Sequence, residues 1–256
     1  MRPRWALPAV LAAGAMGAAG AAEPPRSGFD VMSPPLQAMQ RDDSLNPALL
    51  WVQDGLARWS RPDGATAKAC ADCHGPTPQA TLGGVAARYP AWDAASGRVL
   101  NLADRIERCR QRHQQAAPQA EDSDAALALV AALAHAARGR PMAPPDDPAL
   151  AAARAEGERW WHRRIGQLDL SCADCHDRHA GRRLGGNAIP PGNAAGYPTY
   201  RLEWQTLGSL QRRIRNCMTG VRAEPLVPGS AAMRAIEAWL AGRDRGRPVE
   251  APAVRP

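Results

Sequence analysis

The sequence predicts an all-α fold built from two similar, loop-rich domains. One pentapeptide, Cys-Ala-Asp-Cys-His, occurs twice, and further matches follow each copy at nearly constant spacing. Each copy closes with an alanine-rich stretch of helical character, at residues 124–137 and 230–241. The 256 residues include 23 glycines and 24 prolines but only 5% aromatic residues, which favours helices joined by long loops over extended sheets. We therefore expect two helical domains related by internal duplication.

The composition fits a folded chain and argues against several classes of protein. Hydrophobic residues make up 45%, and 32 basic residues against 25 acidic ones give a formal charge of +7. The basic residues form no lysine-rich tract and alternate with no aromatic platform, so no nucleic-acid partner is expected. Beyond the N-terminal segment, no apolar run approaches the roughly 20 residues of a membrane-spanning helix, so no integral membrane segment is expected after signal removal.

Residues 1–22 have the order of a secretory signal peptide. Arg2 and Arg4 precede an apolar run from about Trp5 to Met16, and small residues lead up to Glu23. The mature protein is therefore expected to be exported, most simply to a bacterial periplasm. An uncleaved membrane anchor is the alternative, and the short apolar run disfavours it.

The repeated pentapeptide spans residues 70–74 and 172–176. Its Cys-x-x-Cys-His pattern is the attachment motif of c-type haem, in which two thiols bond to the porphyrin and the histidine binds iron. Zinc and thioredoxin-like sites also use Cys-x-x-Cys, but the first needs two further ligands and the second a preceding strand. The sequence thus predicts two covalent haem c groups. The expected attachment residues are Cys70, Cys73, Cys172 and Cys175, and the expected proximal iron ligands are His74 and His176.

The register of the repeat divides the chain. The offset between copies is 102 at the pentapeptides and grows to 108 from Tyr89 and Tyr197 onward. A proline-rich segment near 141–148 separates the copies. We expect a first haem domain at 23–145, a second at 146–248, and a flexible tail at 249–256.

The repeat also indicates the sixth iron ligands. Methionine is the usual partner of histidine in electron-carrying c-type domains, but Met142 and Met218 have no methionine counterpart in the other copy. Cysteine is shared, at Cys109 and Cys217, which predicts His74/Cys109 and His176/Cys217 ligation. A Cys109–Cys217 disulfide and an ordinary Met or His ligand remain as alternatives. Four other histidines without counterparts are expected to be structural or on the surface: His113, His135, His162 and His179.

The residues around the two distal cysteines differ in charge. An arginine lies four residues before each, Arg105 and Arg213, and could pair with haem propionates in both domains. Asp104 and Glu107 of the first copy are replaced by Arg212 and Arg215 in the second. Because arginine binds oxyanions through paired N–H groups, the second haem is predicted to adjoin a small-anion site. The alternatives are a solvated basic face or a face that docks an acidic partner.

Several segments resemble the SoxA family, the c-type cytochrome subunits of the SoxAX complex of thiosulfate oxidation. They are Gly28–Pro34, Gln37–Gln40, Asn46-Pro47 with Leu50–Val52, Arg213–Cys217 and Val221–Pro225. The resemblance runs from about 28 to 248 and fits the two-haem type, since both haem motifs and both distal cysteines are present.

The resemblance implies an activity, L-cysteine S-thiosulfotransferase. Thiosulfate would be coupled oxidatively to a cysteine of a SoxYZ-like sulfur carrier, giving a cysteine S-thiosulfonate and passing two electrons to an acceptor cytochrome c. It implies that Cys217 is both iron ligand and catalytic residue, working as a persulfide, and that Arg213 holds the substrate. A SoxX-like monohaem cytochrome c is implied as the partner in a heterodimer.

Two other functions compete with this interpretation. A plain periplasmic dihaem electron carrier would need no chemistry at Cys217. A dihaem peroxidase would need a releasable distal ligand and nearby acid–base residues, and the even use of cysteine in both copies argues against it.

Overall fold

The computed structural model describes Met1 and residues 27–256, so the predicted signal peptide lies outside the described residues. The longer helices are α1 (Pro34–Arg41), α2 (Leu49–Ser60), α5 (Leu102–Cys109), α6 (Asp124–Ala136), α7 (Pro148–His162), α9 (Leu210–Gly220) and α10 (Ala231–Arg243). The shorter turns are α3 (Ala71–His74), α4 (Pro78–Leu82), η1 (Ala86–Arg88), η2 (Arg110–Gln114) and α8 (Cys172–His176). Within the described part of the chain, no helix is both long and apolar enough to cross a bilayer.

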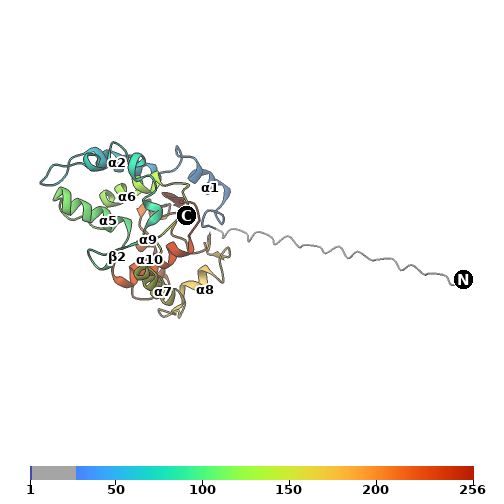
Figure 1. Cartoon of the computed structure of the whole chain (residues 1–256). Helices are drawn as coiled ribbons and strands as arrows, with labels where there is room; N and C mark the ends of the chain where they lie inside the picture. Colours follow the sequence, from blue (N-terminus) through green and yellow to red (C-terminus); the bar gives the residue numbers. More distant parts are fainter. Residues whose placement is uncertain (2–26) are drawn as a thin grey trace.

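Two helix pairs form the scaffold. Helix α2 packs on α6, and α7 packs on α10, at opposite ends of the molecule (Figure 1). Each crossing depends on a glycine: a Cβ on Gly55 would lie 2.1 Å from the carbonyl oxygen of Ala128, and one on Gly157 would lie 2.0 Å from that of Ala235. The backbones can approach this closely only because both positions lack a side chain.

Short strands add to the helices, so the all-α expectation is wrong in detail. Strand β1 (Ala91–Asp93) pairs antiparallel with β2 (Arg98–Leu100), and β5 (Thr199–Arg201) pairs with β6 (Thr206–Gly208). A small hairpin joins β3 (Arg183–Leu184) to β4 (Asn187–Ala188). Strands of two or three residues are too short for a period of two to be seen in the sequence. Moreover, β5 is buried at every position and shows no alternation.

The C-terminal residues are also not the flexible tail that was expected. Strand β7 (Ala253–Arg255) pairs parallel with β5, giving the sheet order β6-β5-β7. Ala251, Ala253 and Val254 are fully buried. The side-chain amide of Asn46 donates to the carbonyl of Pro252 at 3.1 Å, so the N-terminal segment also packs against these residues.

Hydrophobic clusters join the two halves into one body. One contains Ala134 and Met142 from the first half and Ala195, Ala241 and Val249 from the second. A second cluster packs residues of α2 and α6 against Tyr200 and Leu207 of the β5–β6 hairpin. The chain is therefore a pair of helical units with a shared apolar interface, not two independent domains joined only by a linker.

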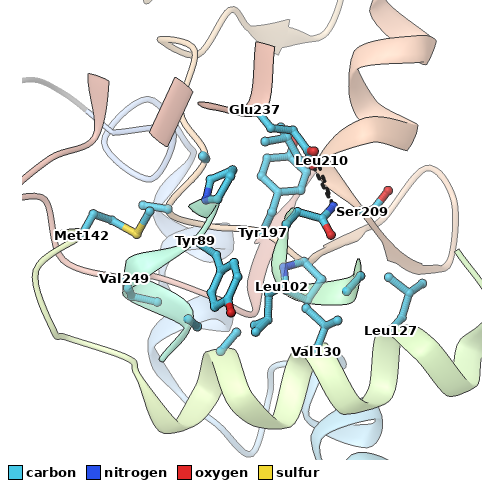
Figure 2. Close-up of a pocket in the computed structure, with 18 of the residues that line it drawn as sticks. Tyr89, Leu102, Leu127, Val130, Met142, Tyr197, Ser209, Leu210, Glu237 and Val249 are labelled. Atoms are coloured by element: carbon cyan, nitrogen blue, oxygen red, sulfur yellow. Dashed lines mark hydrogen bonds between the residues drawn. The ribbon is translucent and has the colours of Figure 1, made fainter. Parts of the chain in front are cut away.

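A cavity of about 110 Å³ lies in this interface. Tyr89 and Tyr197, equivalent residues of the two halves, face into it, and the Glu237 carboxylate lies at one end (Figure 2). Close by, the buried guanidinium of Arg234 binds Asp104 at 2.7 Å, Glu121 at 3.2 Å and Glu237 at 2.7 Å. The interface thus combines an apolar wall with a buried ionic network.

Candidate functional site

The second pentapeptide forms one helical turn with a well-defined start. Ser171 caps α8: its hydroxyl accepts from the backbone N–H of Asp174 at 3.1 Å, and the Asp174 carboxylate accepts from the N–H of Ser171 at 2.8 Å. This capping box fixes the turn that carries Cys172 and Cys175. The apolar cluster around Cys172 includes Leu210 and Ile214, so α9 covers the turn.

His176 is held in one orientation and one tautomer. Its Nδ1 lies 2.7 Å from the carbonyl oxygen of Pro190, and its ring lies against Trp161 with centroids 5.7 Å apart. A carbonyl oxygen can only accept, so Nδ1 carries a proton, and Nε2 is the ring nitrogen left to bind a metal or, when protonated, to stabilise the Cys217 thiolate. Histidines that bind a metal through one ring nitrogen typically donate the other to a backbone carbonyl, as His176 does to that of Pro190.

Cys217 lies on α9 facing His176. Burial by itself raises the pKa of the Cys217 thiol, but His176 and the positive charges of Arg213 and Arg201 outweigh burial, and the net shift is downward. Burial and the neighbouring Cys217 raise the pKa of Cys175, and they raise that of Cys172 to about 11. Of these three thiols, Cys217 is the one stabilised as a thiolate.

The first pentapeptide has a similar frame. Cys70 precedes α3, and the rings of Trp59 and His74 lie 5.8 Å apart. Trp59 also donates its indole N–H to the carbonyl of Gly75 at 2.9 Å. Cys109 ends α5 close to Cys73, but burial and that neighbour raise the pKa of the Cys109 thiol, with only Arg105 lowering it.

In the first site Arg105 is paired with a buried acid that it shares with a second arginine. The guanidinium donates from Nε to the Tyr89 hydroxyl at 3.1 Å and pairs with the buried Asp93 at 3.4 Å. Asp93 also binds Arg108 at 3.1 Å. In the second half the equivalent of Asp93, 108 residues later, is Arg201. The second site therefore has no acid at this position, and Arg201 instead pairs with the half-exposed Glu203 at 2.9 Å.

The predicted residues assemble into two separate groups. His74 with Cys70, Cys73 and Cys109 lie in the first half, and His176 with Cys172, Cys175, Arg213 and Cys217 lie in the second. No disulfide joins Cys109 to Cys217, which lie in different halves of the molecule. Met142 and Met218 are buried in the protein core, at 5% and 6% exposure.

The residues present fit a c-type haem. Each half offers two thiols on one turn, an imidazole beside a tryptophan, and an apolar cluster next to the first cysteine. In the second half the His176 imidazole and the Cys217 thiol lie close together, and they would supply the nitrogen and thiolate donors for the iron of a bound haem.

Sequence reasoning missed three features of the second site. Arg201 and Tyr197 belong to it, and the Pro190 carbonyl orients His176. The register of the repeat held a signal for the first, because it aligns Arg201 with Asp93. The expected ring of arginines is also looser than predicted: Arg212 lies over the Trp204 ring at 4.3 Å, and Arg215 is exposed.

Comparison with known proteins agrees with this arrangement. The family model of the SoxA/TsdA cytochrome c domain matches the chain twice, at residues 54–142 and 156–249. The chain belongs to the SoxA/TsdA cytochrome c family. Membership implies haem c as the cofactor.

Individual relatives extend over most of the chain. It is 33% identical to the L-cysteine S-thiosulfotransferase subunit SoxA of Rhodovulum sulfidophilum, over 90% of this chain and 80% of that protein. It is 32% identical to the same subunit of Pseudaminobacter salicylatoxidans, over 84% of this chain and 76% of that protein. The crystal structure of SoxXA from P. pantotrophus matches with a TM-score of 0.85 and 29% identity, covering 90% of this chain and 86% of that one.

Proposed function

We propose that this chain is the dihaem subunit of a periplasmic L-cysteine S-thiosulfotransferase. The observation that carries the proposal is the placement of Cys217: a half-buried thiol on α9 with a lowered pKa, close to His176 and to the positive charge of Arg213. The names of the similar SoxA subunits support the same activity.

The proposed reaction conserves atoms and electrons in two stages. First, the outer sulfur of thiosulfate forms an S–S bond with Cys217, which has given up its proton, and two electrons leave to an acceptor cytochrome c. Second, the thiolate of a SoxYZ-like carrier attacks that outer sulfur, and Cys217 leaves as a thiolate. The product is the carrier's cysteine S-thiosulfonate. Cys217 is regenerated, ready for the next thiosulfate.

Each residue has a defined part in this scheme. Cys217 is the catalytic nucleophile and leaving group, and its lowered pKa suits both parts. Arg213 holds the sulfonate end of thiosulfate through paired N–H groups. Haem c, when bound, would supply a one-electron acceptor, and Cys172, Cys175, His176 and Cys217 would hold it.

The first half is proposed to hold a second haem c. Cys70 and Cys73 would attach it, and His74 and Cys109 would bind its iron. The double match of one family model supports both a second haem and the origin of the halves by duplication. The likeness to a SoxXA structure supports a SoxX-like monohaem cytochrome c as the partner in a heterodimer.

The test combines composition, spectroscopy and turnover. The purified protein, co-produced with its monohaem partner, is assayed for haem content, for the EPR spectrum of the oxidised form, and for thiosulfate-dependent reduction of cytochrome c with a carrier thiol. We expect two haems in this chain, low-spin signals of the thiolate type, and turnover that requires the carrier. A His/Met or His/His spectrum without carrier-dependent turnover would instead support a plain electron carrier.

A further inference from the structure

The two distal sites differ in one buried charge that the repeat places in register. Asp93 closes β1 in the first half, and Arg201 closes β5 in the second, 108 residues later. Both residues are 7% exposed. A buried carboxylate has therefore been replaced by a buried guanidinium at the same place in the hairpin.

The reversal changes the charge that faces the distal cysteine. In the first half Asp93 pairs with Arg105 and Arg108, at 3.4 and 3.1 Å. In the second half Arg213 faces no acid at the equivalent position. Arg201 binds Glu203 at 2.9 Å, and Glu203 also accepts from the side-chain amide of Asn216, the neighbour of Cys217, at 3.5 Å. Arg201 therefore lies beside the part of α9 that carries Arg213 and Cys217.

The Arg201 guanidinium also has a hydrogen-bond donor that the described residues leave unpaired. One terminal nitrogen donates to Glu203 at 2.9 Å, and the guanidinium lies 5.2 Å from the centre of the Trp204 ring. Its Nε–H is buried and has no hydrogen-bond partner among the described residues. A buried donor of this kind costs free energy unless a ligand satisfies it. The side chain of Glu203 is 45% exposed and so offsets the charge only partly.

We propose that Arg201 is a second anion-binding residue, which forms with Arg213 a two-arginine clamp for a doubly charged sulfur oxyanion beside Cys217. The inference rests on the proposed function and extends it from one arginine to two. Two guanidinium groups match a dianion better than a monoanion, because each can donate to a separate charged oxygen. The clamp therefore selects substrate by charge as well as by shape.

A pair of probes separates charge from shape. Thiosulfate is a dianion, whereas methanethiosulfonate keeps the outer sulfur but replaces one charged oxygen by a methyl group. Binding of each is measured by calorimetry on the haem-loaded heterodimer with its haems reduced, so that oxidation of thiosulfate is prevented. The preference for thiosulfate over methanethiosulfonate then reports the clamp.

The variants are Arg201→Gln, Arg201→Lys and Glu203→Gln. The matched control is Arg212→Gln, on α9, whose guanidinium also lies over the Trp204 ring. We expect Arg201→Gln to raise the thiosulfate Kd about tenfold or more but the methanethiosulfonate Kd less than about threefold. Arg201→Lys should recover part of the loss. Glu203→Gln should tighten thiosulfate binding, because it removes the competing acid. Arg212→Gln should change either Kd less than about twofold.

Equal losses for both probes, or no loss, in Arg201→Gln would overturn the clamp. If Arg201→Gln loses haem or thermal stability, the test rests on Glu203→Gln, which changes a half-exposed side chain. An unchanged thiosulfate Kd in Glu203→Gln would also overturn the clamp. Failure of the proposed function has a different signature. The wild-type protein would then show the preference for thiosulfate in binding but no carrier-dependent turnover.

Discussion

The two Cys-x-x-Cys-His sites share their frame and differ in what faces the distal cysteine. The tryptophan–histidine ring distances are 5.8 Å in the first site and 5.7 Å in the second. Burial acts in the same direction on both distal thiols, raising the pKa of each. Yet the pKa of Cys109 ends above its ordinary value and that of Cys217 ends below it. The difference must therefore come from neighbouring polar groups, not from depth in the protein.

Those groups are few and can be named. In the second site the imidazole of His176 and the charges of Arg213 and Arg201 stabilise the Cys217 thiolate. In the first site the buried Asp93 is shared by two arginines of α5 and offsets part of their charge. One scaffold can therefore hold a distal thiol with a raised pKa or one with a lowered pKa, and the groups around the thiol decide which, chiefly His176 and Arg213 in the second site.

Replacing the two distal cysteines in turn tests most directly whether they have different roles. Cys217→Met should keep both haems attached, because the attachment cysteines are untouched, but lower carrier-dependent turnover at least about 1000-fold, since a methionine cannot carry the sulfur. The matched Cys109→Met variant should lose less than about tenfold. Turnover is measured as thiosulfate-dependent reduction of cytochrome c, with haem content as the control. Equal losses would mean that the two sites do not divide their roles as proposed.

The paired arginines give the next largest difference. Arg213→Gln should lower kcat/KM for thiosulfate about 100-fold, because it removes a charge that faces the reacting sulfur. Arg105→Gln should lower it less than about threefold, because Asp93 already balances Arg105. Steady-state kinetics of the two variants measures kcat/KM for thiosulfate in each. Similar losses would assign both arginines to haem propionates and remove the anion site from the second half.

Much of this comparison could be predicted from the sequence. The pentapeptides, the shared cysteines and the helical stretches were visible because each is a short pattern with a fixed spacing. Predicted helices that begin at Asp124 and Ser230 correspond to α6 and α10. Their capping serines, Ser123 and Ser230, fix the starts locally, which is why these boundaries could be read along the chain.

The rest depended on contacts between distant segments. Strand β7 is fixed by pairing with β5, and its alanines and valine have no pattern that distinguishes a buried strand from a tail. The oriented tautomer of His176 depends on the backbone carbonyl of Pro190, for which no residue type gives a signal. Arg201 is one arginine among many until its place on the hairpin is known. Sequence thus predicted the shared frame better than the residues that make the sites differ.

The two helix crossings allow a comparison of stability. Gly55→Ala and Gly157→Ala should each lower the free energy of unfolding by about 3 kcal/mol, since the new Cβ would overlap a backbone carbonyl in either pair. Gly186→Ala, where the space is open, should change it by less than about 1 kcal/mol. Urea unfolding of the haem-loaded protein measures all three. A large loss in one half only would show that the two crossings are not equivalent supports.

The free energy of unfolding should depend on pH through Glu237, a carboxyl buried in the interface between the halves. Burial raises the pKa of this carboxyl from 4.5 to about 7, against the lowering effect of Arg234 and with Glu121 and Asp104 raising it further. Gln211 and Asn101 donate to the same carboxylate, at 2.9 and 3.2 Å. With three acids around one arginine, a retained proton relieves excess negative charge in a buried place.

The sign of the resulting pH dependence follows from proton counts. Between pH 4.5 and about 7 the folded protein holds a proton on Glu237 that the unfolded chain has released. The stability from this group is therefore full below pH 4.5 and is lost as pH rises through about 7. One proton limits the slope to roughly 1.4 kcal/mol per pH unit. In urea unfolding, Glu237→Gln should remove this slope, whereas the exposed Glu158→Gln should leave it unchanged. If Glu237→Gln keeps the wild-type slope, the proton is held elsewhere and the two halves are joined by apolar packing rather than by this network.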